Sequence, residues 1–117
     1  MKKFGLPKTS LLRKPKEFTR VYRQGRRLKG AGFSLIFLAN DHSGSRLGIS
    51  VHRMLRGAVR RNRIKRIVRE VFRLNRDLFP QASDIVFTVG PNFQLSSAKA
   101  VHQAVAGLAA RYQVEQT

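Results

Sequence analysis

The sequence predicts an α+β fold in which a small mixed sheet is packed against helices. In three stretches, apolar residues recur at intervals of three and four, which predicts helices. Short apolar runs bounded by glycine, proline or turn residues predict strands between them. The elements follow the order helix, strand, strand, helix, strand, helix. At 117 residues, the chain is long enough for one modest core, so residues 1–117 are predicted to form a single domain.

The first element is a short amphipathic helix that follows a basic N-terminal arm over residues 1–13. Pro15 suits the first turn of a helix, and Gly25 can close its end. Apolar residues three and four positions apart predict that one face of this helix packs on the domain. These residues are Phe18, Val21 and Tyr22.

Three short runs are predicted to be strands. Residues 33–38 and 46–53 are separated by the turn-rich stretch 40–45, which predicts a hairpin-like connection between them. Residues 84–89 form the third predicted strand. Side chains alternate between the two faces of a strand. In the second run this alternation places Leu47, Ile49 and Val51 on one face and Gly48, Ser50 and His52 on the other.

The stretch 56–76 is the most one-sided part of the chain, with eight Arg, one Lys and a single acid, Glu70. Its periodicity predicts a helix that Pro80 ends. If strands 46–53 and 84–89 are parallel neighbours, this helix is the crossover between them. Its apolar stripe consists of Ile64, Ile67, Val68, Val71, Phe72, Leu78 and Phe79. Its polar face carries Asn62, Arg66, Arg69 and Arg73, flanked by Lys65 and Arg76 on one side and by Arg63 on the other.

A last helix is predicted near the C-terminus, where Ser96 or Ser97 can cap its first turn. Apolar residues on one face of this helix predict that it also packs on the sheet. They are Ala98, Val101, Val105, Leu108 and Tyr112.

The charge of the chain predicts an anionic partner. The formal net charge is +18, and 22 of the 24 basic residues lie within residues 1–76. A solvated helix face usually mixes charges of both signs, whereas calmodulin targets and membrane-surface helices are typically appended to a fold. Here the apolar side of the basic helix is predicted to form half of the core. We therefore favour a nucleic acid as the partner.

Catalytic chemistry is not predicted for the protein itself. Cysteine is absent, which excludes disulfides and thiolate metal sites. The pair Glu70 and Asp77 shares a helix flank with arginines that would neutralise it, and Asp41 lies in a turn-rich stretch. We predict no catalytic residue and no metal site in the protein. No apolar run is long enough to span a membrane and no secretory signal precedes Pro7, so the predicted location is the cytoplasm.

The run from Gly57 to Arg73 resembles the signature of the bacterial ribonuclease P protein subunit, with Arg61-Asn62-Arg63-Ile64-Lys65-Arg66 as its core. Residues 18–25, 47–51 and 84–87 are similar to the first helix and to two strands of that family. Two positions depart from the family pattern. Met54 replaces one of a pair of lysines, and Ile36 stands where many members have an aromatic residue.

The resemblance implies an enzyme whose catalyst is RNA. In that family the RNA binds most of the Mg²⁺ and cleaves the 5′ leader from precursor tRNA, no protein partner is required, and the crossover is left-handed. The catalytic RNA would be bound by Arg60, Arg61, Asn62, Arg63, Lys65, Arg66, Arg69 and Arg73. The leader would be bound by Phe18, Tyr22, Phe33, Ser50, His52 and Arg53.

Two alternatives and one ambiguity remain open at this stage. Composition alone also suits a ribosomal or general RNA-binding protein with no enzymatic partner. A freestanding nuclease would need a cluster of carboxylates, which the sequence does not show. Phe18 and Tyr22 are equally well interpreted as core residues of the first helix and as stacking surfaces for a single strand.

Overall fold

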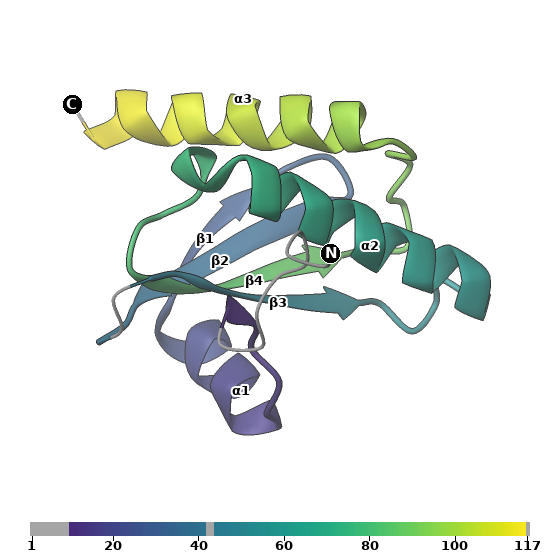
Figure 1. Ribbon diagram of the computed structural model, residues 1–117, viewed down its shortest axis with the longest axis horizontal. Coiled ribbons are helices and arrows are strands. Elements are labelled where there is room, and N and C mark those ends of the chain that lie inside the picture. Colours follow the sequence, from purple (N-terminus) through teal and green to yellow (C-terminus); the bar gives the residue numbers. More distant parts are fainter. Residues whose placement is uncertain (1–9, 42–43, 117) are drawn as a thin grey trace, which may run out of the picture.

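The computed structural model describes residues 10–41 and 44–116, so most of the predicted arm lies outside the described residues. A four-stranded sheet forms the middle layer, with α2 and α3 on one face and α1 on the other (Figure 1). The elements in chain order are α1 (Pro15–Gln24), β1 (Arg26–Lys29), β2 (Phe33–Ala39), β3 (Arg46–Val51), α2 (Ala58–Leu74), the short 3-10 helix η2 (Arg76–Leu78), β4 (Ser83–Val89) and α3 (Ala98–Gln116). This arrangement confirms the predicted α+β class.

The order of strands in the sheet is β1-β2-β4-β3. β4 pairs antiparallel with β2 and parallel with β3. The prediction of a hairpin-like connection over residues 40–45 is therefore wrong, because β4 lies between the two strands that this stretch joins. The parallel pairing confirms that α2 connects neighbouring parallel strands. The left hand of this crossover stays a prediction.

Strand β1 was not predicted from the sequence. Three of its four residues are basic, so the stretch has no apolar alternation. It becomes a strand because it pairs antiparallel with β2 along its whole length. Gly25 joins α1 to β1, which confirms the predicted end of α1. Its φ of −83° is one that any residue can adopt. A Cβ atom on Gly25 would lie 2.5 Å from the carbonyl oxygen of Val21, so close packing selects glycine here.

The main core lies between the sheet and the helices α2 and α3. Ile64, Val68, Val71 and Phe72 of α2 are buried in it, which confirms most of the predicted stripe. The helix ends at Leu74 rather than near Pro80, since the Asn75 side chain donates a hydrogen bond to the Val71 carbonyl at 3.1 Å. Leu78 and Phe79 therefore lie beyond α2. Phe79 still joins the core, with its ring centroid 5.1 Å from that of Phe72.

The C-terminal helix α3 is close to its prediction. The backbone N–H of Ala100 donates to the Ser97 hydroxyl at 3.1 Å, so Ser97 is the capping serine. Val101, Val105 and Leu108 are buried. Ala98 is exposed, because it lies at the first turn before the helix reaches the sheet. Among the residues that the structure describes, no helix combines the length and apolar character needed to cross a membrane.

A second, smaller core lies between the sheet and α1. It contains Leu12, Val21, Ile36 and Val86, with Phe18 packed against it. The backbone N–H of Leu12 donates to the Leu47 carbonyl at 2.9 Å, so the segment before α1 runs beside the edge strand β3. Both faces of the sheet are thus covered, but α1 covers its face with far fewer apolar side chains.

Candidate nucleic-acid interface

The exposed face of α2 presents cations that have no role within the fold. Asn62, Arg66 and Arg69 are exposed. Within residues 10–41 and 44–116, their side chains have no hydrogen-bond or ion-pair partner. Because the buried stripe on the opposite side holds the helix on the sheet, this face of α2 points away from the protein without help from a ligand. This part of the predicted RNA-binding set is available to contact phosphates.

Four other residues of the predicted RNA-binding set are engaged within the protein. Arg61 uses its guanidinium to donate hydrogen bonds to the carbonyls of Val51, His52 and Leu55 at 3.2, 3.0 and 3.0 Å. It thereby fixes the connection from β3 to α2. Arg60 donates to the carbonyl of Phe93 at 3.2 Å, Arg63 to that of Ser96 at 3.5 Å, and Arg73 pairs with Glu70 at 2.7 Å. The pairing of Arg73 with Glu70 is of the kind that the i, i+3 spacing predicts. The sequence pattern could not separate Arg60, Arg61 and Arg63 from Arg66 and Arg69, because carbonyl partners have no sequence signature.

A hollow of about 300 Å³ lies at the β3 edge of the sheet. Lys65 and Arg69 of α2 line one side, and Arg13 and Phe18 line the other. Gly48 of β3 forms part of the floor. A Cβ atom on Gly48 would lie 2.6 Å from the Phe18 ring, so glycine allows that ring to rest on the strand. The hollow therefore combines an aromatic ring with cations from two segments, the residues before α1 and α2.

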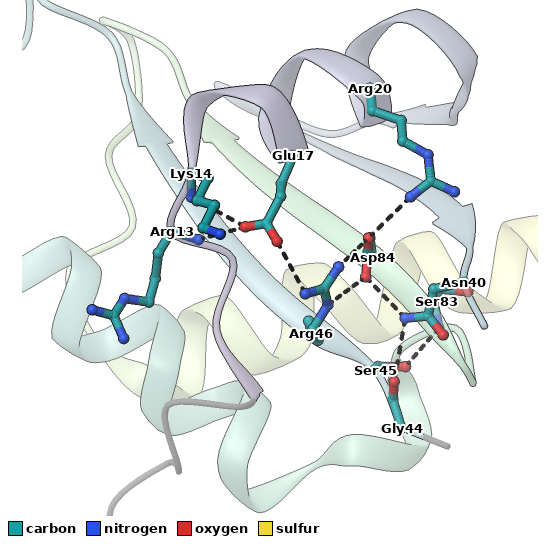
Figure 2. Close-up of polar contacts among 10 residues, drawn as sticks. All are labelled: Arg13, Lys14, Glu17, Arg20, Asn40, Gly44, Ser45, Arg46, Ser83 and Asp84. Carbon is teal, nitrogen blue, oxygen red and sulfur yellow. Dashed lines mark hydrogen bonds and ion pairs between the residues drawn. The ribbon is translucent and has the colours of Figure 1, made fainter. Parts of the chain in front are cut away.

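The position of α1 depends on a cluster of charged side chains at one end of the sheet, shown in Figure 2. Asp84 of β4 is 1% exposed, and Arg46 donates to both of its carboxylate oxygens at 2.9 and 2.8 Å. The same guanidinium donates to Glu17 of α1 at 3.1 Å. Asn40 also donates to Asp84 at 2.9 Å, and Arg20 of α1 lies 3.7 Å from it. Arg46 thus connects α1 to the sheet (Figure 2).

Both carboxylates of this cluster are stabilised in their charged form. Backbone N–H groups of Lys14 and Arg13 donate to Glu17, and together with Arg46 they lower the pKa of Glu17 despite partial burial. Burial raises the pKa of Asp84, but the hydrogen bonds from Arg46 and Asn40 outweigh it and leave that pKa below its ordinary value. This cluster was not predicted from the sequence. The parallel register that sets Arg46 opposite Asp84 is the only signal that could have found it.

The predicted leader-binding residues do not all share one surface. The assignment of Phe33 to leader binding is wrong, because this residue is 5% exposed. Its ring stacks on that of Phe87 in the main core, at 5.0 Å between centroids. Tyr22 is 40% exposed, whereas Val21 beside it is fully buried. The ambiguity over α1 concerned Phe18 and Tyr22, and the structure resolves it in part: Phe18 packs against the smaller core, whereas Tyr22 offers an exposed ring.

The remaining predicted leader residues lie at the β3 edge. Ser50 is on the α1 side of β3, while His52 and Arg53 are exposed in the turn after it, since β3 ends at Val51. The His52 Nδ1 atom accepts a hydrogen bond from the backbone of Met54 at 3.0 Å. Ile36, at the position where the family often has an aromatic residue, lies under α1 and is 1% exposed. In the described part of the chain, no three His, Asp or Glu side chains come together that could hold a metal ion.

This fold and this surface define a class of protein: a basic α+β domain with cationic helices on both sides of a mixed sheet, suited to binding a nucleic acid. The family model described as Ribonuclease P matches residues 6–113. The chain therefore belongs to the ribonuclease P protein family.

Known relatives agree with this assignment. The chain is 60% identical over 108 residues to the ribonuclease P protein component of Desulfotalea psychrophila, which covers 92% of this chain and 90% of the relative. The solved RNase P protein from Thermotoga maritima has 33% identity and a TM-score of 0.75, covering 86% of this chain and 96% of that one. A Staphylococcus aureus RNase P protein mutant with defective mRNA degradation activity has 25% identity and a TM-score of 0.76, covering 91% and 90%.

Proposed function

We propose that the chain is the RNA-binding protein subunit of ribonuclease P, which removes the 5′ leader from precursor tRNA. The observation that carries this proposal is the exposed face of α2, where Arg66 and Arg69 are held on a rigid helix with no partner among the described residues. Cations that a fold leaves unpaired in this way are suited to the phosphates of a structured RNA. On this proposal α2 binds the catalytic RNA.

The hollow at the β3 edge, between α2 and the start of α1, would bind the single-stranded leader. Single strands are bound by aromatic rings that stack on bases and by cations that follow the backbone. The hollow lined by Phe18, Arg13, Lys65 and Arg69 has both, and Tyr22 exposes a second ring one helical turn beyond Phe18. Because Lys65 and Arg69 belong to α2, the leader would lie directly beside the bound catalytic RNA.

We assign catalysis to the RNA, which would also bind most of the Mg²⁺. The contribution of the protein is electrostatic. Its net charge of +18 would replace part of the screening that Mg²⁺ otherwise supplies between the RNA and the tRNA backbone. The protein should therefore lower the Mg²⁺ concentration that cleavage requires.

Cleavage of precursor tRNA by the RNA alone, by the protein alone and by both tests this proposal. We expect no cleavage by the protein alone, and cleavage by the mixture at a lower Mg²⁺ concentration than by the RNA alone. An unchanged Mg²⁺ requirement would contradict the electrostatic role. Tight binding of unrelated RNAs without any effect on ribonuclease P RNA would instead indicate a general RNA-binding protein.

A second candidate function follows from the S. aureus relative, whose mutant is described by a defect in mRNA degradation. The same experiment therefore includes an mRNA incubated with the protein alone. We expect the mRNA to stay intact. Degradation that copurifies with the protein and disappears in a variant of its basic surface would establish a nuclease activity separate from tRNA maturation.

A further inference from the structure

The face of the sheet that carries α1 is only partly covered by this helix. Neighbouring strands place Gly48, Val86 and Ile36 side by side on this face, and α1 with Leu12 covers them. Residues that alternate with them, such as Phe87 of β4, point into the main core on the other side. The covered row therefore identifies which side chains of each strand belong to the α1 face.

A second row of side chains lies on the same face, two residues away from the covered row along each strand. It consists of three hydroxyl groups and, on β1, a lysine. The register pairs Ser50 with Thr88, Thr88 with Ser34, and Ser34 with Lys29. The row crosses the sheet from the β3 edge to the β1 edge, a path of about 14 Å at a strand spacing of about 4.8 Å. Ser50 and Thr88 are partly exposed and Lys29 is exposed, whereas Ser34 is nearly covered. None of these four residues belongs to the apolar cluster under α1.

The basic residues of β1 are divided between the two faces of the sheet. Leu28 packs against the main core, and the guanidinium of Arg26 lies over the Tyr112 ring of α3 at 5.0 Å. Alternation therefore places Arg27 and Lys29 on the α1 face. Both are exposed, and within the described part of the chain neither side chain has a hydrogen-bond or ion-pair partner. The uncovered row thus ends at Lys29, and Arg27 lies next to it on the same face, at the end of the row that contains Ile36.

We propose that Arg27 and Lys29 bind backbone phosphates of the upstream part of the leader, so that the leader crosses the sheet from the β3 edge to the β1 edge. This inference rests on the proposed function and extends its leader site. α2 packs beside β3 and α3 beside β1. Catalytic RNA bound on α2 therefore places the cleavage-proximal nucleotides at the β3 edge. Along the way the partly exposed Ser50 offers a hydroxyl group, and Thr88, which donates to the Ser34 carbonyl at 3.5 Å, offers an oxygen that can accept. The cations at β1 match the charge of the departing strand.

Basic residues on an edge strand also have a simpler explanation, because they prevent edge-to-edge association of sheets. That explanation applies equally to Arg26, Arg27 and Lys29, which all lie on β1. The leader path applies only to Arg27 and Lys29. Arg26 is therefore a matched control, with the same charge on the same strand but on the opposite face.

The test measures binding of reconstituted ribonuclease P to precursor tRNA with a long leader, to precursor tRNA with a leader too short to span the sheet, and to mature tRNA. The double variant Arg27→Gln/Lys29→Gln removes both charges and keeps polar side chains at exposed positions. We expect it to weaken binding of the long-leader precursor and to reduce the salt dependence of that binding by about 1.4 units of slope, at about 0.7 per single-strand phosphate. Binding of the other two RNAs should not change.

Arg26→Gln should leave all three affinities at the wild-type value. Equal effects of Arg26→Gln and of the double variant, an equal loss with the short leader, or no loss at all would overturn the proposed path. A melting temperature close to that of the wild type shows that the double variant is folded, and the single variant Lys29→Gln repeats the test if it is not. A wild-type enzyme that bound precursor and mature tRNA equally would refute the leader site itself.

Discussion

The two basic helices α1 and α2 lie on opposite faces of one sheet and are attached to it by different forces (Figure 1). α2, which is described throughout, buries four apolar residues. In α1, also fully described, only Val21 is buried. Apart from the packing of Val21 and the partly buried Phe18, its attachment is ionic, through Glu17 and Arg46 to the buried Asp84. The surface proposed for the catalytic RNA is therefore fixed by burial of apolar area, and the surface proposed for the leader is fixed largely by charge.

This difference has consequences for how each surface responds to solution conditions. Burial of apolar side chains does not depend on the ionisation of any group. The ionic attachment requires Glu17 and Asp84 to be charged, and the fold lowers the pKa of both. Their stabilisation is complete above the ordinary carboxyl pKa of about 4 and is lost as the pH falls through the lowered values. Acid should therefore release α1 before α2.

The largest effect is expected from Asp84→Asn, which removes the charge that binds Arg46 and Arg20. Breaking a buried ion pair leaves an uncompensated charge, so we expect the free energy of unfolding to fall by about 3 kcal/mol at neutral pH. The loss should shrink as the pH is lowered, because Asp84 of the wild type then also becomes neutral. Denaturant unfolding at several pH values measures both effects.

Hydrogen exchange shows which helix the Asp84→Asn substitution affects. Amides of α1 should exchange much faster in the variant, while those of α2 should change only with global stability. Val68→Ala in α2 is the opposite control, because it should raise exchange in α2 first. Equal loosening of both helices by Asp84→Asn would show that α1 has no separate ionic attachment.

The second effect concerns two kinds of arginine on α2. Arg61→Ala removes three hydrogen bonds to backbone carbonyls and should lower the free energy of unfolding by about 1.5 to 3 kcal/mol, the range for hydrogen bonds to charged groups. Arg66→Ala/Arg69→Ala should leave stability within about 0.5 kcal/mol of the wild type. It should instead reduce the salt dependence of catalytic-RNA binding by about 1.4 to 1.8 units of slope.

Arg61→Lys separates the two roles of that residue, since it keeps the charge and loses the planar fork of donors. We expect Arg61→Lys to be destabilised like Arg61→Ala, with an unchanged salt slope. Thermal unfolding and a salt titration of binding measure the two quantities on the same samples. Full stability of Arg61→Ala together with a reduced salt slope would instead assign Arg61 to the RNA.

The smallest effect is expected from the exposed ring on α1. Tyr22→Ala should weaken binding of precursor tRNA by the reconstituted enzyme by about 1 to 3 kcal/mol, the value of one stacked base. Mature tRNA binding and assembly with the catalytic RNA should not change. Tyr22→Phe keeps the ring and should bind like the wild type. A fall in melting temperature with equal weakening of all three interactions would show that Tyr22 belongs to the core.

Prediction from the sequence succeeded where the pattern is local and failed where a partner is distant. The apolar stripe of α2 and the strand at 84–89 were predicted because helical and strand periodicity can be recognised within a short run of consecutive residues. β1 was missed because pairing with β2, and not its own composition, makes it a strand. The end of α2 was placed too late, because Asn75 and its bond to Val71 compete with a periodicity that continues to Phe79.

The functional predictions also depended on whether the deciding residues are close together or far apart in the chain. The run from Arg61 to Arg66 was sufficient to predict an RNA-binding helix, since one-sided charge on an amphipathic period needs no tertiary information. The role of each arginine was decided by the fold. Arg61 meets carbonyls of the preceding turn, Arg66 meets none, and the sequence contains no signal that distinguishes them. Phe33 was assigned to the wrong face for a related reason, because strand alternation does not say which face a helix covers.

The sequence by itself therefore determined the α+β class, the basic crossover helix and the family, since each depends on residue types at short and regular spacings. Only the tertiary structure decided the strand order, the ionic attachment of α1 through Arg46 and Asp84, and the cationic end of the hydroxyl row on β1. These features depend on register between strands that are far apart in the chain. A shift of one residue in that register would turn every side chain of a strand to the other face, and the chain order alone does not specify it.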